Sequence, residues 1–260
     1  MRITTWNVNG LRAAIRKGFA DVIDAVKPDV LLLQEIRATP DQLPEPWRSP
    51  KGWHAAWHPA EKLGYAGTAV LSRIPIDNIT TGLATNRRDE HDPEGRVITA
   101  SIAGLELASV YLPSGSSGDH RQREKERWMA RFRPWADHHN KRDTPVVIAG
   151  DLNLARTHAD IYHAKSNEKN SGFLPHERQW INDLIDSGWD DYIRSAWHDA
   201  ELGPFTWWSN RGRARELDRG WRIDYHLGNA AASQRVTHAA IDRELSLEVS
   251  DHAPVSIDLN

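Results

Sequence analysis

The segment that most constrains the fold is Val146–Asn153, which reads VVIAGDLN. Four consecutive apolar residues after Pro145 predict a fully buried strand. Asp151 and Asn153 follow Gly150, at the carboxyl end of this strand, where open α/β sheets place their chemistry. If the extended geometry continues, both side chains point to the same side. An ordinary strand-to-loop turn contains the same residue types, so this segment alone does not establish a functional site.

Other predicted strands in the first half also end in polar groups. Arg2–Asn7 predicts a strand that ends in an asparagine, and Asn9 follows two residues later. Asp29–Glu35 predicts a buried strand with an apolar run followed by Gln34 and Glu35 at its end. We expect these groups to emerge at the same edge of the sheet as Asp151.

The remaining candidates lie on later strands. Tyr111 ends the predicted hairpin Val97–Leu112, and Asp224 lies within the predicted strand RIDYHL. The last strand, in SDHAPVSIDL, is entered through Asp251 and His252. A histidine at a strand start is more often a surface or core residue than a catalytic one, so this motif is informative only together with the others.

Helical periodicity separates these strands, and no linker or low-complexity tract interrupts them. The pattern predicts a single α/β domain over residues 1–260, with two sheets packed face to face and helices outside. Two polar stretches are predicted as loops, at Asn86–Gly95 and His158–Gly172. The predicted helices span Leu11–Val26, Arg121–Lys141 and Glu177–Ser187.

Composition limits the chemistry. The chain has no cysteine, which excludes disulfides, thiolate metal sites and cysteine nucleophiles. A metal would need oxygen or imidazole ligands, which favours Mg²⁺ or Mn²⁺. No apolar run approaches the roughly 20 residues of a membrane span. The net charge of −3 argues against nucleic-acid binding by the whole surface and leaves room for a basic groove. We expect a cytoplasmic monomer without membrane contact.

Together the candidates provide four carboxylates, two carboxamides, an imidazole and a phenol, without a serine or lysine nucleophile. This set fits metal-assisted attack of water on a phosphodiester, in which carboxylates hold Mg²⁺ and a carboxylate or imidazole handles the proton. The candidate residues are Asn7, Glu35, Tyr111, Asp151, Asn153, Asp224, Asp251 and His252.

Six motifs extend this interpretation: WNVNGLRA, LQE, SVYLPSG, GDLN, RIDY and SDHAP. In this order, and spanning nearly the whole chain, they resemble the exonuclease III family of DNA repair nucleases, in the endonuclease/exonuclease/phosphatase superfamily. The resemblance implies a DNase I-like four-layer α/β sandwich with two packed mixed sheets. It also implies Mg²⁺-dependent hydrolysis of DNA, with Mn²⁺ as a substitute. The expected activities are cleavage 5′ to abasic sites, 3′ to 5′ exonuclease action and removal of 3′ blocking groups.

The resemblance assigns metal ligands and catalytic roles residue by residue. Glu35 is the expected principal Mg²⁺ ligand, with Asn7 and Asp251 close by. Asp151 and Asn153 are further oxygen donors near the ion.

In the implied mechanism, Asp151 orients or deprotonates the attacking water, or instead protonates the leaving oxygen; the sequence does not choose. Asn153 positions the water. His252, oriented by Asp224, and Tyr111 donate to the scissile phosphate.

The segment FTWWSNRGRARELDRGWRIDY resembles the DNA-facing loop of this family. Its two tryptophans and an isoleucine would line an apolar pocket for a sugar without a base, and an arginine would enter the duplex or contact phosphate. The loop SNEKNSG would grip the strand near the lesion. The expected substrate-binding residues are Asn9, Arg12, Asn167, Asn170, Trp207, Arg211, Trp221 and Ile223.

Two departures leave the balance among activities open. Ser114 occupies a position where many relatives have Asn or Gln, and Asn9 stands where some have Asp. One alternative is chiefly a 3′ exonuclease or 3′-end-processing enzyme. Another is a phosphoesterase acting on RNA tails, inositol phosphates or sphingolipids. A catalytically inactive DNA-binding module is disfavoured because Glu35, Asp151 and His252 are intact.

Overall fold

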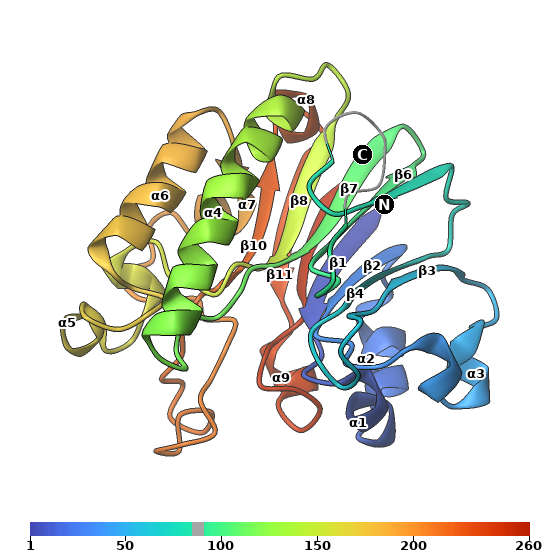
Figure 1. The fold of residues 1–260 in the computed structure, drawn as a ribbon, viewed down its shortest axis with the longest axis horizontal. Helices are drawn as coiled ribbons and strands as arrows, with labels where there is room; N and C mark the ends of the chain where they lie inside the picture. The colour runs from blue at the N-terminus through green and yellow to red at the C-terminus, as the bar shows by residue number, and fades with distance from the viewer. Residues whose placement is uncertain (85–90) are drawn as a thin grey trace.

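The computed structural model describes residues 1–84 and 91–260, and these form two six-stranded sheets packed face to face (Figure 1). Part of the predicted loop Asn86–Gly95, up to residue 90, lies outside the described residues. The first sheet has the order β11 (Val236–Ile241), β12 (Val255–Leu259), β1 (Arg2–Asn7), β2 (Val30–Gln34), β4 (Thr68–Ser72) and β3 (His54–His58). The second has the order β5 (Asn78–Thr81), β6 (Val97–Ile102), β7 (Leu105–Tyr111), β8 (Val146–Asp151), β10 (Asp224–Gly228) and β9 (Asp190–Asp191).

Both sheets are mixed, as predicted. β1 pairs parallel with β2, and β7 pairs parallel with β8, whereas the other neighbours run antiparallel. The parallel pairs are central, and their carboxyl ends carry Asn7, Gln34, Tyr111 and Asp151. This topology brings polar groups from both halves of the chain to one edge.

Helices cover the outer faces and complete the four predicted layers (Figure 1). α4 (Asp119–Asn140) buries Trp128, Phe132 and Trp135 against the second sheet, together with α6 (Pro175–Asp186). On the first sheet lie α1 (Leu11–Arg16) and α2 (Phe19–Val26). The shorter helices are α3 (Glu45–Arg48), α5 (Ala164–Asn167), α7 (Tyr192–Ala196), α8 (Ala230–Ser233) and α9 (Arg243–Ser246).

The prediction of one helix over Leu11–Val26 is wrong. The helix is divided at Gly18, whose φ of 106° lies in the left-handed region. Glycine adopts this conformation without the Cβ clash that other residues meet. The apolar pattern continues on both sides, because both short helices pack on the same sheet face.

The space between the sheets is apolar along most of its length and becomes polar at one end. Ile3, Leu32, Leu107 and Val147 belong to the apolar part. At the other end, Gln34 Nε2 donates to Ser109 Oγ at 2.9 Å and Asn7 Nδ2 donates to Asp151 Oδ2 at 2.9 Å, both across the sheets. Buried polar groups need such partners, and these contacts fix the relative placement of the two sheets at this end.

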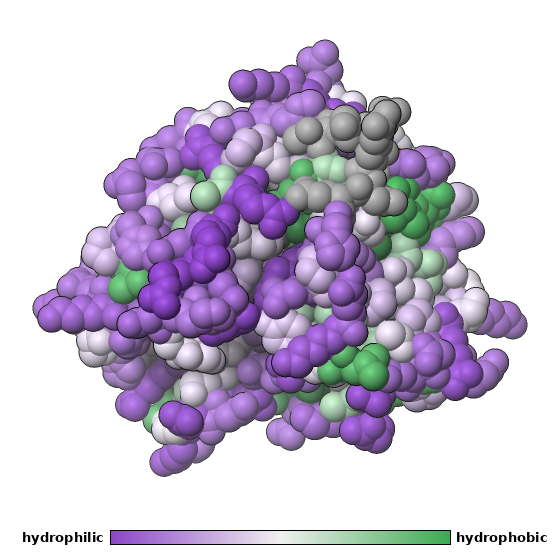
Figure 2. All heavy atoms as spheres, in the orientation of Figure 1, coloured by the Kyte–Doolittle hydropathy of each residue, from purple (hydrophilic) through white to green (hydrophobic). Residues whose placement is uncertain are grey.

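The two ends of the chain lie side by side at the apolar end of the first sheet (Figure 1). β1 and β12 are antiparallel neighbours, the Met1 amino group donates to Leu259 O at 2.7 Å, and Leu259 N donates to Met1 O at 2.8 Å. The face shown in Figure 2 is largely hydrophilic. None of the helices within the described residues is long and apolar enough to cross a membrane.

Candidate active site

The strands that carry the candidates end in turns with unusual backbone geometry. Glu35 follows β2 and Asn153 follows β8, each with a φ of 51°. This conformation costs a non-glycine residue roughly 1–3 kcal/mol and clusters at functional sites. Hydrogen bonds hold both turns: Gly10 N donates to Glu35 O, and Asn153 N donates to Asp151 Oδ1, each at 2.8 Å. The expectation that extended geometry continues to Asn153 is therefore wrong, because the side chains meet through a turn.

A buried carboxamide joins the two sheets. Asn7 Nδ2 donates to Glu35 Oε1 at 3.0 Å and to Asp151 Oδ2 at 2.9 Å. Asn7 Oδ1 accepts from Asn9 N at 3.0 Å, and Asn9 Nδ2 donates to Asp251 Oδ1 at 2.8 Å. This chain of contacts links three carboxylates from separate segments through two neutral amides.

An imidazole and a carboxylate form the second part of the site. His252 Nδ1 lies 2.9 Å from Asp224 Oδ2, and His252 Nε2 lies 3.8 Å from Asp151 Oδ2. Asp224 is fully buried and is the first residue of β10, not an internal one as predicted. The Thr206 hydroxyl accepts from the Asp224 amide at 3.1 Å, which anchors the start of this strand.

Burial and neighbouring charges shift the pKa values of Asp151 and His252. Burial raises the pKa of Asp151 to about 7, with the Asp224 and Glu35 charges adding to the shift and His252 opposing it. For His252, burial lowers the pKa, but the adjacent Asp224 outweighs this effect and the pKa rises to about 10. The imidazole is therefore positively charged at neutral pH, and Asp151 is able to exchange a proton there.

Tyr111 closes the opposite side of the site. Burial raises its pKa well above the usual value, and the Glu35 and Asp151 charges add to the shift. The phenol consequently stays protonated at neutral pH and is a hydrogen-bond donor. Arg96 lies 4.9 Å from the centre of the Tyr111 ring, and its Nη1 donates to Tyr111 O at 3.0 Å, which fixes the end of β7.

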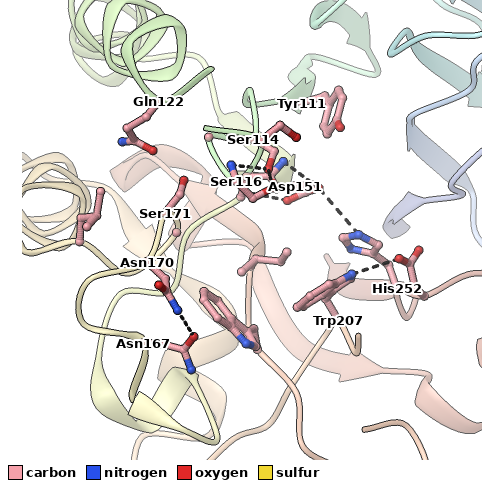
Figure 3. Close-up of a pocket in the computed structure, with 18 of the residues that line it drawn as sticks. Tyr111, Ser114, Ser116, Gln122, Asp151, Asn167, Asn170, Ser171, Trp207 and His252 are labelled. Atoms are coloured by element: carbon pink, nitrogen blue, oxygen red, sulfur yellow. Dashed lines mark hydrogen bonds and ion pairs between the residues drawn. The ribbon is translucent and has the colours of Figure 1, made fainter. Parts of the chain in front are cut away.

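Glu35, Tyr111, Asp151 and His252 line a cavity of about 990 Å³ (Figure 3). Asn7 and Asp224 lie beneath its surface and are fully buried. Arg12 lies instead in a neighbouring cavity of about 420 Å³, together with Arg16 and Arg37. The predicted site residues that line the larger cavity are Asn9, Glu35, Tyr111, Asp151, Asn153, Asn167, Asn170, Trp207, Arg211, Trp221, Ile223, Asp251 and His252.

An aromatic wall adjoins the polar groups. The Trp207 and Trp221 rings meet edge to face, with centroids 6.0 Å apart, and the two residues are paired through their backbones. Trp207 Nε1 donates to Asp251 Oδ2 at 3.2 Å. Arg222, at the end of the same loop, is fully buried and pairs with Asp160 at 2.7 Å, so it stabilises the loop from within.

Sequence reasoning missed several residues of the cavity, and three of them have cationic or carboxamide side chains. Arg37 forms an ion pair with Glu35 and lines both cavities. Lys169 and Gln122 also line the larger cavity. Lys169 could have been found from its place between Asn167 and Asn170, and Arg37 from its spacing two residues after Glu35, because a positive charge near a candidate carboxylate is a usable signal.

The site offers oxygen donors of the kind that a metal ion needs. Within the part of the chain that the structure describes, no three His, Asp or Glu side chains form a ready-made metal cage. Mg²⁺, however, is commonly held by one or two carboxylates and keeps several waters. Glu35 and Asp251 supply hard oxygen donors of this kind, and the carboxamide of Asn7 lies next to Glu35, with its Nδ2 3.0 Å from Glu35 Oε1. The residues present therefore fit Mg²⁺.

The endonuclease/exonuclease/phosphatase family model matches residues 4–252, so the chain belongs to this family. Its relatives place it more narrowly. It is 33% identical over 261 residues to an exodeoxyribonuclease of Bacillus subtilis, with full coverage of both chains. It is 35% identical over 261 residues to the DNA repair nuclease APEX1 of Danio rerio, covering all of this chain and 82% of that protein. The chain is thus a hydrolase of the exonuclease III and AP endonuclease group.

A solved structure shows the same fold. The 3′ phosphatase NExo from Neisseria, bound to a product DNA hairpin, superposes with a TM-score of 0.89 at 31% identity. The match covers 100% of this chain and 99% of that one. The predicted DNase I-like architecture of two packed mixed sheets flanked by helices is confirmed.

Proposed function

We propose that this protein is a Mg²⁺-dependent DNA repair phosphodiesterase that incises duplex DNA 5′ to abasic sites and also degrades or cleans 3′ ends. The observation that carries the proposal is one cavity that joins the proton-handling groups Asp151 and His252 to the Trp207–Trp221 wall. The names of the relatives, which include an exodeoxyribonuclease and a DNA repair nuclease, support it.

Glu35, Asn7 and Asp251 would hold the ion, with Asp151 and Asn153 as nearby oxygen donors. Bound Mg²⁺ supplies positive charge that offsets the charge of the phosphate. Mn²⁺ prefers similar oxygen ligands and would substitute for it.

The protein groups provide proton transfer and hydrogen bonding. A pKa of about 7 allows Asp151 to accept a proton from the attacking water and to return it to the leaving oxygen. Asn153, which bonds Asp151 through Nδ2 at 3.2 Å, positions that water. His252 and Tyr111 donate to phosphate oxygens, and Asp224 keeps His252 charged and oriented.

The aromatic wall would recognise the abasic site. Trp207, Trp221 and Ile223 offer an apolar surface to a sugar without a base, and such a nucleotide costs little to unstack. Arg211 would contact or enter the duplex. Asn167 and Asn170, which are bonded to each other at 2.8 Å, would grip the adjoining strand, while Asn9 and Arg12 would contact it on the other side. The partner is therefore duplex DNA.

A second candidate is an enzyme that mainly processes 3′ ends. Ser114 Oγ lies 3.0 Å from Ser116 Oγ on the cavity wall, at a position where the resemblance to the family leads us to expect a carboxamide. The solved relative described as a 3′ phosphatase is consistent with this candidate.

The deciding experiment is cleavage of a duplex oligonucleotide with one central synthetic abasic site, in Mg²⁺ or in EDTA, by wild type and Asp151→Asn. Fully paired, 3′-recessed and 3′-phosphorylated duplexes serve as comparison substrates. Incision 5′ to the abasic site that needs Mg²⁺ and is lost in the variant is the expected result. Release of 3′ nucleotides or phosphate without incision would favour the second candidate, and no reaction with any DNA would overturn both.

A further inference from the structure

A buried ion pair lies behind the cavity and has no part in the chemistry proposed above. Lys125 of α4 and Glu177 of α6 both have fully buried side chains, and Lys125 Nζ lies 2.6 Å from Glu177 Oε1. A buried ion pair is weak evidence for stability, since apolar side chains of similar volume often serve as well. The contacts that these charges make with the main chain indicate what the pair does.

The lysine reaches the turn that carries a proposed catalytic residue. Lys125 Nζ donates to Asn153 O at 2.9 Å. The Asn153 side chain donates to Leu112 O at 2.8 Å and to Asp151 Oδ2 at 3.2 Å. Because Asn153 has a positive φ, its turn depends on such surrounding contacts to keep its shape.

The glutamate reaches the cavity wall formed by residues 167–174, which we call the wall segment. Glu177 Oε2 accepts from Gly172 N at 2.7 Å and from Leu174 N at 3.0 Å. Gly172 O accepts in turn from Ala155 N at 2.8 Å, so the wall segment also contacts the chain just beyond Asn153. Figure 3 shows Asn167, Asn170 and Ser171 of this segment facing the cavity.

We propose that Lys125 and Glu177 are a positioning pair that joins the wall segment to the Asn153 turn, so that the DNA-gripping surface and the catalytic turn are held by one buried contact. The pair touches neither substrate nor metal. This inference rests on the proposed function for the roles of Asn153 and the wall segment. It predicts a division of effects: Lys125 acts on kcat through Asn153, and Glu177 acts on the KM for DNA through the wall segment.

Two double variants separate these effects without leaving a buried charge alone. In Lys125→Met/Glu177→Gln, the glutamine oxygen still accepts from the Gly172 and Leu174 amides. In Lys125→Met/Glu177→Met that acceptor is also lost. Leu105→Ala is the matched control, because Leu105 is fully buried at the start of β7, at the opposite end of that strand from Tyr111.

The measurements are kcat and KM on the abasic duplex, and hydrogen exchange of the Gly172 and Leu174 amides in the free protein. Both double variants should lose kcat by about 10- to 100-fold, the range expected when a catalytic group is slightly misplaced. Only Lys125→Met/Glu177→Met should also lose amide protection and gain about 10-fold in KM. Leu105→Ala should lower the unfolding midpoint while leaving kcat and KM unchanged.

Three outcomes would overturn the positioning role. One is wild-type kcat and KM in both double variants, and another is equal exchange of the Gly172 and Leu174 amides in the two. The third is that Leu105→Ala at matched stability loses kcat equally, which would mean that the effect is loss of stability alone. If wild type cleaves no DNA while the exchange difference appears as expected, the proposed function fails and the coupling of the wall segment to Glu177 stands.

Discussion

At the scale of single residues, the site places the positively charged imidazole of His252 next to the carboxyl group of Asp151. Asp151 Oδ2 and His252 Nε2 are 3.8 Å apart, so the protonation state of each group affects the pKa of the other. Asp224 lies behind the imidazole and bonds Nδ1, which leaves Nε2 directed toward the cavity side. The imidazole therefore depends on Asp224 for its charge and its orientation.

Asp224→Asn should lower the pKa of His252 from about 10 toward its ordinary value. Since the imidazolium is lost as the pH rises through the lowered pKa, we expect kcat to fall more at pH 9 than at pH 6. The check is the pH dependence of cleavage from pH 5.5 to 9.5, with the exposed His120→Gln as control. A uniform loss at every pH would mean that Asp224 does not act through the charge of His252.

The placement of single residues was predictable where it follows directly from chain position. Glu35 and Asp151 each follow an apolar run, and a residue at that place emerges at the sheet edge whatever the rest of the chain does. Arg37 is close to Glu35 in the sequence, but the ion pair between them depends on positive φ angles at both residues. Such angles are not visible in a pattern of apolar and polar residues.

At the scale of elements, α4 depends on aromatic packing. Phe132 is fully buried, with its ring centroid 5.0 Å from that of Trp128 and 5.2 Å from that of Trp135. The mean hydropathy of α4 is low because its other face is charged. The stability of this helix in the protein therefore comes from the buried aromatic face.

Phe132→Ala should lower the free energy of unfolding by about 3–5 kcal/mol, because it removes a buried ring and leaves a cavity. Urea denaturation provides the measurement. The control is His120→Ala on the exposed side of the same helix, which should change the value by less than about 0.5 kcal/mol. A loss under about 1 kcal/mol for Phe132→Ala would show that the neighbouring rings close the cavity.

Long elements with a buried face were predictable, whereas the edge strands β5 and β11 were not. Periodic apolar residues revealed α4 and α6 to within a few residues. The edge strands β5 and β11 contain exposed positions and no continuous apolar run, so their pairing depends on partners distant in the sequence. The division at Gly18 was also hidden, because both short helices contribute to one apolar face.

At the scale of the whole molecule, one histidine lies between the sheets. His226 of β10 is fully buried, and its Nε2 donates to Val255 O of β12 at 2.9 Å. Its Nδ1 has no hydrogen-bond partner among residues 1–84 and 91–260. Burial lowers the pKa of His226 to about 4, so the folded protein holds this ring neutral.

Stability should therefore fall with acid. Between pH 6.5 and about 4 the unfolded chain binds a proton at His226 that the folded protein does not, which lowers the free energy of unfolding by about 3 kcal/mol across this range. His226→Gln removes this titration, so its stability relative to wild type should rise as the pH falls from 7 to 4. Urea titrations at several pH values measure the difference, and parallel curves would contradict the assignment.

The charge distribution gives a second expectation for the whole molecule. The net charge is −3, yet Arg12, Arg16 and Arg37 gather in one cavity beside the site. Arg12→Ala should weaken DNA binding in EDTA more at low salt than at high salt, and should reduce the slope of log K against log salt by about 1. Arg213→Ala is the control, because Arg213 is exposed and paired with Glu216. An unchanged slope would exclude a phosphate contact by Arg12.

The adjacent ends of the chain have a practical consequence for handling the protein. Met1 and Leu259 are hydrogen-bonded at one end of the β1–β12 pair, whereas Asn7 lies at the other end of β1, about 20 Å from Met1 at the rise of an extended strand. An affinity handle, a dye or a surface tether joined to either terminus would lie on the side opposite the cavity. A molecule immobilised through either end would present the cavity to the solution.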